Sequence, residues 1–224
     1  MSVLTFAFLV AASLQQTQPA RHITFVEGFE SGGNTGRWSF FGNPDNAIET
    51  VEPSGGRPGA WWHSTCDGFD CLDTFAPSFR TEEGTSSVFT GDYRARGVRS
   101  LGIDAAVLGP EFVSTGDRPL TLMLRHDPDT PEEFSDDVIV FRRGGNIPDL
   151  GQWRHYRYPV PSQSNTLPAN WFVQQGSGDE DADWNAVMAD VDQVTFFFGD
   201  PEFFYIFQQW ELGVDDISIR WTRP

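Results

Sequence analysis

Short runs in which apolar and polar residues alternate recur along the chain, separated by clusters of Gly, Pro, Asn and Asp. Alternation of this kind is typical of half-buried β-strands joined by turns. We therefore expect an all-β protein built from antiparallel strands. The predicted strands cover residues 23–27, 38–41, 47–51, 60–63, 98–108, 120–125, 138–141, 152–158, 194–198 and 214–221, with a loop-rich stretch over 76–90.

One segment departs from the period of two. Its apolar residues recur at the spacing of one helix face, which predicts a short helix near 184–191. Asp181 or Asp183 would cap its N-terminus. The sequence has no internal repeat and no stretch that resembles a linker. Residues 21–224 are therefore expected to form a single domain.

The closing strand carries two adjacent carboxylates, Asp215 and Asp216, within an apolar alternation. Because side chains alternate across a strand, we expect one carboxylate on each face, and the inward one needs a cation or a hydrogen-bonded partner. Glu27 and Glu30, near the first strand, are the candidate partners. Calcium takes several oxygen ligands, so these four residues predict a calcium site joining the first and last strands. The alternative is that they are solvent-facing carboxylates at strand ends.

Aromatic residues make up 14% of the 224 residues, which suits the core of a β-sandwich. Trp61 and Trp62 are adjacent, so a strand would place one ring on each face. An exposed ring can bind a sugar by stacking on its apolar face, and exposed aromatic patches often mark binding sites. Trp61 and Trp62 are therefore the candidate ligand-binding residues, with packing in the core as the alternative.

The charge balance narrows the range of partners. Fifteen basic residues stand against 32 acidic ones, and the formal net charge is -17. Such a surface repels nucleic acid and anionic membranes, so neither is expected as a partner.

Two features predict a secreted or extracytoplasmic protein. Residues 1–20 contain an apolar run, followed by a polar stretch, that suits a signal peptide or leader and is too short to span a bilayer, although the usual basic start is missing. Cys66 and Cys71 are the two cysteines of the chain, and in an exported protein they are expected to form a small-loop disulfide. We expect no membrane insertion of the mature chain.

Two acidic stretches, 127–137 and 178–183, raise other possibilities. Paired carboxylates in the first could act as general acid and base at a glycosidic bond, and the second could be a calcium loop. Turn-forming residues in the first and helix-capping positions in the second favour solvated loops. The sequence has no nucleophile elbow and no phosphate-binding glycine loop. We therefore predict that the protein is not an enzyme and assign no catalytic residue.

A series of motifs carries a family resemblance: Gly91-Asp92-Tyr93, Leu101–Asp104, Arg118–Leu122, Asp136–Val140, Gly151–Trp153 and Gly213–Ile217. In this order, over about 89–219, they resemble the laminin B type, or laminin IV, domain. The opening Phe29–Gly32 with Trp38 is similar to the start of jelly-roll modules, including carbohydrate-binding modules. Both resemblances imply a β-sandwich of the jelly-roll or galactose-binding kind, and neither implies catalysis. Jelly-roll modules also imply a structural calcium between the first and last strands.

These observations lead to three hypotheses. The first is a secreted, non-enzymatic β-sandwich module that binds a glycan or an extracellular protein, with a structural calcium ion. The second is a surface or matrix protein whose fold serves assembly without a small ligand. The third is a polysaccharide-active enzyme, which would require two carboxylates facing each other across a cleft.

Overall fold

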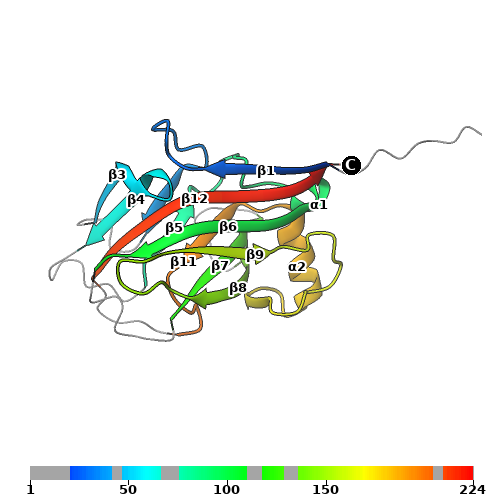
Figure 1. Cartoon of the computed structure of the whole chain (residues 1–224). Coiled ribbons are helices and arrows are strands. Elements are labelled where there is room, and N and C mark those ends of the chain that lie inside the picture. Colours follow the sequence, from blue (N-terminus) through cyan, green and yellow to red (C-terminus); the bar gives the residue numbers. More distant parts are fainter. Residues whose placement is uncertain are drawn as a thin grey trace, which may run out of the picture.

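The computed structural model describes residues 21–41, 47–66, 76–109, 118–128, 136–203 and 209–223. They form two antiparallel sheets packed face to face (Figure 1). The expected all-β sandwich is therefore confirmed, with two short helices where the sequence predicted one.

The first sheet, sheet A, is built around the long closing strand. Its order is β3 (Ile48–Gly56), β4 (Gly59–Cys66), β12 (Trp210–Arg223), β6 (Val98–Val107) and β9 (Trp153–Pro159), and β1 (Arg21–Glu27) also pairs with β12. The register of β1 on β12 runs from Arg21 opposite Arg223 to Glu27 opposite Ile217. The predicted meeting of the first and last strands is confirmed.

The second sheet, sheet B, contains six shorter strands. Their order is β10 (Phe172–Gln175), β8 (Val138–Asn146), β7 (Pro119–His126), β11 (Gln193–Phe197), β5 (Ser78–Thr81) and β2 (Trp38–Phe41). The sequence analysis missed β5 and β10. Each has only four residues, too few to show a clear period, and each is defined by its pairing with a neighbouring strand.

Helix α2 (Glu180–Ala189) begins before the predicted 184–191. Its N-cap is Asp179, whose side chain accepts a hydrogen bond from the backbone N–H of Ala182 at 3.1 Å. The predicted caps, Asp181 and Asp183, lie inside the first turn instead. Helix α1 (Tyr93–Arg96) is a single helical turn that was not predicted from the sequence. Neither helix is long and apolar enough to cross a membrane.

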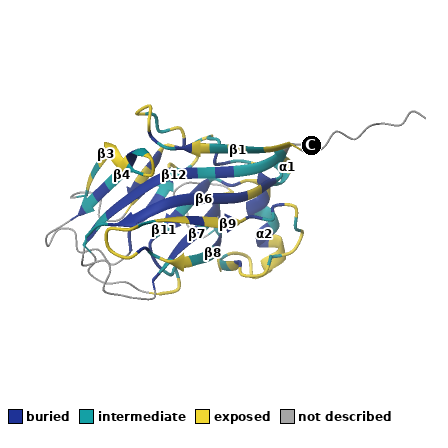
Figure 2. Cartoon of the chain, in the orientation of Figure 1, coloured by how far each residue is buried: buried dark blue, intermediate teal, exposed yellow. Residues whose placement is uncertain are grey.

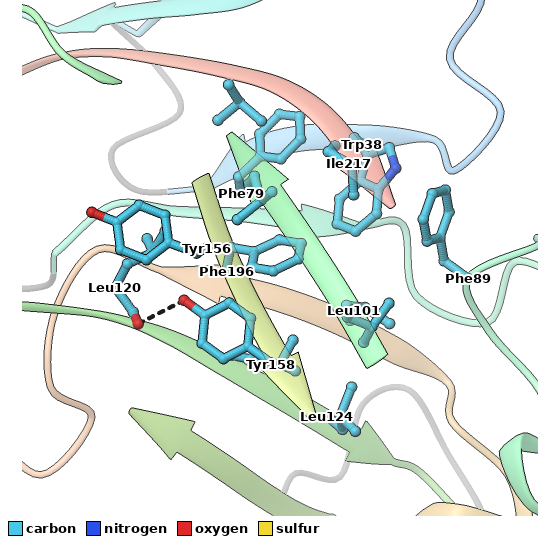
Figure 3. Close-up of a cluster of buried hydrophobic side chains, with 14 of the residues drawn as sticks. Trp38, Phe79, Phe89, Leu101, Leu120, Leu124, Tyr156, Tyr158, Phe196 and Ile217 are labelled. Atoms are coloured by element: carbon cyan, nitrogen blue, oxygen red, sulfur yellow. Dashed lines mark hydrogen bonds between the residues drawn. The ribbon is translucent and has the colours of Figure 1, made fainter. Parts of the chain in front are cut away.

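The core lies between the sheets and is rich in aromatic rings (Figures 2 and 3). Trp38 stacks on Phe79 with ring centroids 5.4 Å apart. The buried Tyr158 hydroxyl, from sheet A, donates a hydrogen bond of 2.7 Å to the backbone carbonyl of Leu120 in sheet B (Figure 3). Most of the described aromatic side chains are therefore packed in the core between the two sheets.

Candidate functional site

A β-bulge in β12 sets the direction of the two adjacent carboxylates. The register with β6 shifts between Asp215 and Ser218, and Asp216 has a φ of 44°. Val214 and Ile217 both face the core and are fully buried, so two residues instead of one separate the core-facing positions. The expectation of one carboxylate on each face is therefore wrong. Both carboxylates leave the core side, because the bulge inserts an extra residue into the alternation.

Asp215 is fully buried on the outer face of sheet A and tied to backbone groups. One oxygen accepts the N–H of Asp216 at 2.7 Å, and the other accepts the N–H of Arg57 in the β3–β4 hairpin. An added side chain at Gly56 would lie 2.6 Å from this second oxygen, so glycine permits the close approach. Asp215 thus attaches the hairpin to the closing strand.

Three further groups surround this buried carboxylate. Asp104 faces Asp215 across the β6–β12 pairing and is 5% exposed. Its carboxylate contacts Nδ1 of His155 at 2.6 Å. Glu30 accepts the backbone N–H of Ala60 at 3.1 Å. We call Glu30, Asp104, Asp215 and Asp216 the carboxylate cluster.

Two members of the cluster, Asp215 and Asp216, have raised pKa values. Burial raises the pKa of Asp215 to about 6, against two backbone hydrogen bonds that lower it, and the charges of Asp216 and Asp104 raise it further. Burial also raises the pKa of Asp216, aided by the charges of Asp104 and Glu30. The four acids therefore repel one another at neutral pH, a situation that a cation would relieve.

The predicted calcium ligands are only partly brought together. Glu27 faces the core side of sheet A, opposite Ile217, and its carboxylate accepts the backbone N–H of Gly36 at 3.0 Å. It caps a loop and is separated from the other three. Within the described residues, three metal-binding atoms within 4.8 Å of one another occur in other groups, such as Asp127 with Asp136 and Asp137. The quartet as predicted is not such a group.

The two candidate tryptophans lie under other parts of the chain. Trp61 is 9% exposed; its Nε1 donates to the Ser54 carbonyl at 3.0 Å, and its ring meets that of Trp153 at 5.5 Å. Trp62 points toward the core, and its Nε1 donates to Glu49 at 2.9 Å. Their role in ligand binding stays a prediction, and their burial directs attention to other surfaces. Cys66 is buried at the end of β4, whereas Cys71 lies outside the described residues, so the disulfide also stays a prediction.

A hollow lies on the outer face of sheet B. It is a groove of about 460 Å³ that crosses strands from β2 to β10, within the range of small-ligand sites. Met123, Ile139 and Phe197 form an apolar part of its lining, and Phe41 and Phe203 are 44% and 65% exposed. Its polar lining includes Arg80, Arg125, Asp137, Gln174, Gln193 and Thr195. This combination of apolar surface and hydrogen-bonding groups suits a polar organic ligand.

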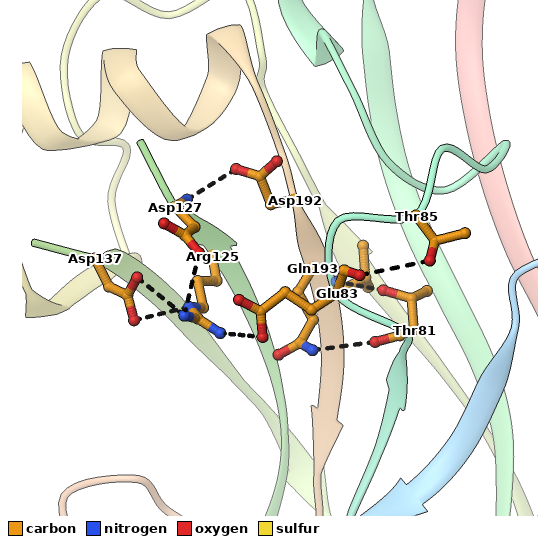
Figure 4. A network of polar contacts seen from close by, with 9 residues as sticks. Thr81, Glu83, Thr85, Arg125, Asp127, Asp137, Asp192 and Gln193 are labelled. Carbon is orange, nitrogen blue, oxygen red and sulfur yellow. Dashed lines mark hydrogen bonds and ion pairs between the residues drawn. The ribbon is translucent and has the colours of Figure 1, made fainter. Parts of the chain in front are cut away.

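Arg125 is the centre of a buried polar network beside the groove (Figure 4). Its guanidinium makes two contacts with Asp137, at 2.8 and 3.0 Å, and one with Glu83 at 2.6 Å. Asp127 lies 3.7 Å away. Contacts on several sides fix the guanidinium plane, which makes it a rigid part of the groove wall.

Gln193 adds a second fixed polar group. Its side-chain N–H donates to the carbonyl of Thr81 at 3.1 Å, while the Thr81 hydroxyl accepts the N–H of Val194 at 3.0 Å (Figure 4). The sequence analysis had no signal for these positions. Arg125 was only the last residue of the predicted strand 120–125, and Gln193 stood just before the predicted strand 194–198. Their convergence depends on which strands are neighbours in sheet B.

The comparisons with known proteins describe the fold. No protein-family model matches the sequence, and no curated protein matches it. Among solved structures, the chain is similar to an exo-beta-agarase, with a TM-score of 0.48 and 13% identity over 90% of this chain and 26% of that one. The L4b domain of human laminin alpha-2 matches with a TM-score of 0.39 and 14% identity over 64% of this chain and 69% of that one.

A carbohydrate-binding module from Caldicellulosiruptor saccharolyticus, CBM27-1 in complex with mannohexaose, matches with a TM-score of 0.39 and 10% identity over 88% of this chain and 96% of that one. Laminin and carbohydrate-binding β-sandwich domains are thus among the structures that this chain resembles, as the sequence predicted. The chain spans about a quarter of the agarase it matches, at 26%. At these identities the likeness concerns the fold alone.

Proposed function

We propose that the protein is a non-catalytic module that binds a glycan in the groove on the outer face of sheet B. The observation that carries this proposal is the groove itself, about 460 Å³ in volume, with exposed Phe41 and Phe203 beside fixed polar side chains. Sugars present apolar ring faces to aromatic side chains and hydroxyls to amides, carboxylates and guanidinium groups. The groove offers both kinds of surface.

The shape of the groove supports a ligand of more than one sugar unit. Its lining comes from all six strands of sheet B and from the segment after β11, or from residues directly next to these elements. A ligand would therefore lie across the strands. An assembly surface, the second hypothesis from the sequence, would more naturally be a flat apolar patch without fixed polar groups.

The charged residues of the groove favour binding over catalysis. Asp137 is held by Arg125, and Glu202 pairs with Arg143. Hydrolysis of a glycosidic bond needs one carboxyl group that carries a proton and a second that acts as base or nucleophile. Carboxylates committed to arginines are poorly suited to the first of these roles.

The direct test is a glycan-array screen of residues 21–224, followed by calorimetry with the glycan that binds. We expect Phe203→Ala to weaken binding by about tenfold, since removing one stacking ring costs on the order of 1 kcal/mol. Ile48→Ala is the control, because Ile48 is 63% exposed, similar to Phe203 at 65%, but lies on sheet A. Binding that survives Phe203→Ala unchanged would place the ligand elsewhere and refute the groove as the site.

We also propose that the carboxylate cluster binds a structural calcium ion. The donor chemistry supports this, since carboxylates of the cluster can supply the hard oxygen ligands that calcium takes. Glu30, Asp104 and Asp216 are the proposed ligands, with Asp215 held by backbone N–H groups at their centre. The ion would neutralise charge between β1, β6 and β12 and stabilise their junction.

Thermal unfolding in excess chelator and in millimolar calcium tests this second proposal. A ligand that binds only the folded state raises the unfolding temperature by mass action. We expect a rise of several degrees with calcium that Asp216→Ala abolishes. Glu180→Ala is the control, since Glu180 is an exposed acid in the first turn of α2 and lies apart from the carboxylate cluster. If the wild-type protein unfolds at the same temperature in chelator and in calcium, the proposed calcium ion is ruled out.

Export and the Cys66–Cys71 disulfide complete the proposal. An exported glycan-binding module is consistent with the net charge of -17 and with the apolar run in residues 1–20. The expected mass of the exported chain corresponds to cleavage near residue 20, with both thiols resistant to alkylation until a reductant is added. Intact-mass spectrometry of the secreted protein gives both answers.

A further inference from the structure

The charged side chains that line the groove differ in how they are neutralised. Arg125 is paired with Asp137 and Glu83. Glu202 is paired with Arg143, which also makes two hydrogen bonds to Asp200 at 2.8 and 2.9 Å. In the described part of the chain, the guanidinium of Arg80 has no ion pair with a carboxylate. Among the charged lining residues that the structure describes, Arg80 is therefore the one without a direct ion pair.

Arg80 is nevertheless held in a defined position. Its Cζ atom lies 3.6 Å from the centroid of the Phe41 ring, so the guanidinium stacks on that ring. The backbone of Arg80 is fixed in β5, opposite Ser39 of β2 on one side and Thr195 of β11 on the other. Stacking uses the face of a guanidinium and leaves its N–H groups in the plane available.

A partly buried charge without a counter-ion carries a desolvation cost. Burial lowers the pKa of Arg80, the charge of Glu83 raises it, and the charge of Arg125 lowers it again. Glu83 is attracted to Arg80, but its carboxylate is in contact with Arg125 at 2.6 Å. An incoming anion would supply the missing partner and form charge-assisted hydrogen bonds with the guanidinium fork.

We infer that the groove selects an acidic glycan and that Arg80, stacked on Phe41, binds its carboxylate or sulfate group. The inference rests on the proposed glycan-binding function and names the ligand class for the same groove. Carboxylate and sulfate share the chemistry that Arg80 recognises, a compact anion with several acceptor oxygens. Fixed groups such as Gln193 are then left for the hydroxyls.

The overall charge of -17 does not exclude an anionic ligand. At physiological ionic strength the screening length is about 8 Å, so exposed charges on sheet A act weakly across the sandwich. Close to Arg80, the carboxylates of Glu83, Asp127 and Asp137 lie against the single guanidinium of Arg125, so an anionic group has to be bound by direct contact with Arg80 rather than by a positive local field. The net charge should lower the rate of association with an acidic polymer, while the contact with Arg80 sets the preference among bound glycans.

The test compares glycans that differ only in the anionic group. Residues 21–224 are measured by calorimetry against oligogalacturonate and its methyl ester, and against dextran sulfate and dextran, after an array containing acidic and neutral glycans of other linkages. We expect binding to require the anion, and Arg80→Gln to reduce affinity by about tenfold to a hundredfold, as for loss of a charge-assisted hydrogen bond. Arg99→Gln on sheet A is the control, because the Arg99 side chain donates a hydrogen bond of 3.3 Å to the neutral Thr222 hydroxyl and forms no ion pair within the described residues.

The outcomes separate this inference from the proposed function. Binding to carboxylated glycans alone, or to sulfated glycans alone, on the array would support the inference and show which anionic group the protein recognises. Binding of neutral glycans that Phe203→Ala weakens and Arg80→Gln leaves unchanged would overturn the acidic preference while supporting the groove. Binding that neither variant changes, or no binding to any glycan, would overturn both.

Discussion

Asp215 is the residue whose ionisation the fold constrains most clearly. It is fully buried, and burial is the main reason that its pKa rises to about 6 from an ordinary value of 3.8. Because the folded-state pKa lies above the unfolded one, the folded protein binds the proton more tightly. The stability gained from protonation is fully present below about pH 4 and is lost as the pH rises through about 6.

We therefore expect Asp215→Asn to change the pH dependence of unfolding. In chelator, the free energy of unfolding of the wild type should fall relative to that of the variant between about pH 4 and pH 7. Urea unfolding of both proteins at each pH measures this difference. Comparing the two removes the contribution of other acids, including Asp200, whose pKa is lowered by Arg143 despite its partial burial. Parallel pH profiles would contradict the raised pKa.

Gly213 is a second residue whose role is decided by its neighbours. A side chain added there would lie 2.8 Å from the Trp61 ring and 2.9 Å from the Trp153 ring. Both rings cross β12 at this glycine. We expect Gly213→Ala to destabilise the protein by about 1–3 kcal/mol, as overpacking does in other cores.

Gly145→Ala provides the matched control in a strand. Its added carbon would meet only the Tyr156 ring, at 4.0 Å, an ordinary contact distance. Urea unfolding should therefore show a clear loss for Gly213→Ala and little change for Gly145→Ala. Equal stability of the two variants would show that the tryptophan rings can move apart without cost.

At the level of elements, helix α2 is fixed through carboxylates at its start. Asp179 caps the first turn, and Asp183 is 2% exposed and accepts both the N–H and the hydroxyl of Ser177 at 2.9 and 2.8 Å. The two acids therefore act differently. One satisfies an exposed helix end, and the other joins the helix to the preceding loop.

We expect Asp179→Ala to cost about 1 kcal/mol, the usual effect of removing an N-cap. Asp183→Ala should cost more, on the order of 2–3 kcal/mol, because it removes a buried carboxylate that accepts two hydrogen bonds from Ser177. Glu180→Ala, an exposed residue in the same turn, is the control. In denaturant unfolding, the loss of stability should be largest for Asp183→Ala, smaller for Asp179→Ala and smallest for Glu180→Ala. A larger loss of stability for Asp179→Ala than for Asp183→Ala would reverse our assignment of roles.

The elements that were predicted and those that were missed differ in physical terms. Strands β6 and β12 have 10 and 14 residues and alternate over most of their length, so the apolar period identifies them. Strand β5 lies in the stretch expected to be loop-rich, yet Phe79 is fully buried and Arg80 points into the groove. Its pairing with β2 and β11 supplies the stabilisation that its own sequence does not indicate.

At the level of the whole molecule, the two sheets are joined by hydrogen bonds as well as by apolar packing. The hydroxyl of Tyr158 spans the core to the carbonyl of Leu120. Tyr156 makes a similar bond of 2.6 Å to the carbonyl of Asn146, an exposed residue. If the Tyr156 hydroxyl is removed, water can donate to the exposed Asn146 carbonyl in its place. If the Tyr158 hydroxyl is removed, water cannot easily reach the buried Leu120 carbonyl.

We expect Tyr158→Phe to destabilise the sandwich by about 1–3 kcal/mol, because a buried carbonyl loses its partner. Tyr156→Phe, the matched control, should cost less than about 1 kcal/mol. Calorimetric unfolding of both variants measures the difference. A Tyr158→Phe variant as stable as the wild type would mean that the Tyr158–Leu120 hydrogen bond does not stabilise the sandwich.

The sequence by itself determined the fold class, most of the strands, the pairing of the first and last strands and the neighbourhood of Glu30, Asp215 and Asp216. These features follow from the local alternation of apolar and polar residues and from the cost of burying a charge, both of which can be assessed from the sequence alone. Only the tertiary structure decided that a bulge turns both aspartates to one face, that Glu27 caps a loop and that Trp61 is covered. It also decided the groove, because Arg80, Arg125 and Gln193 come from three different strands. Their meeting depends on strand order in sheet B, which no local pattern encodes.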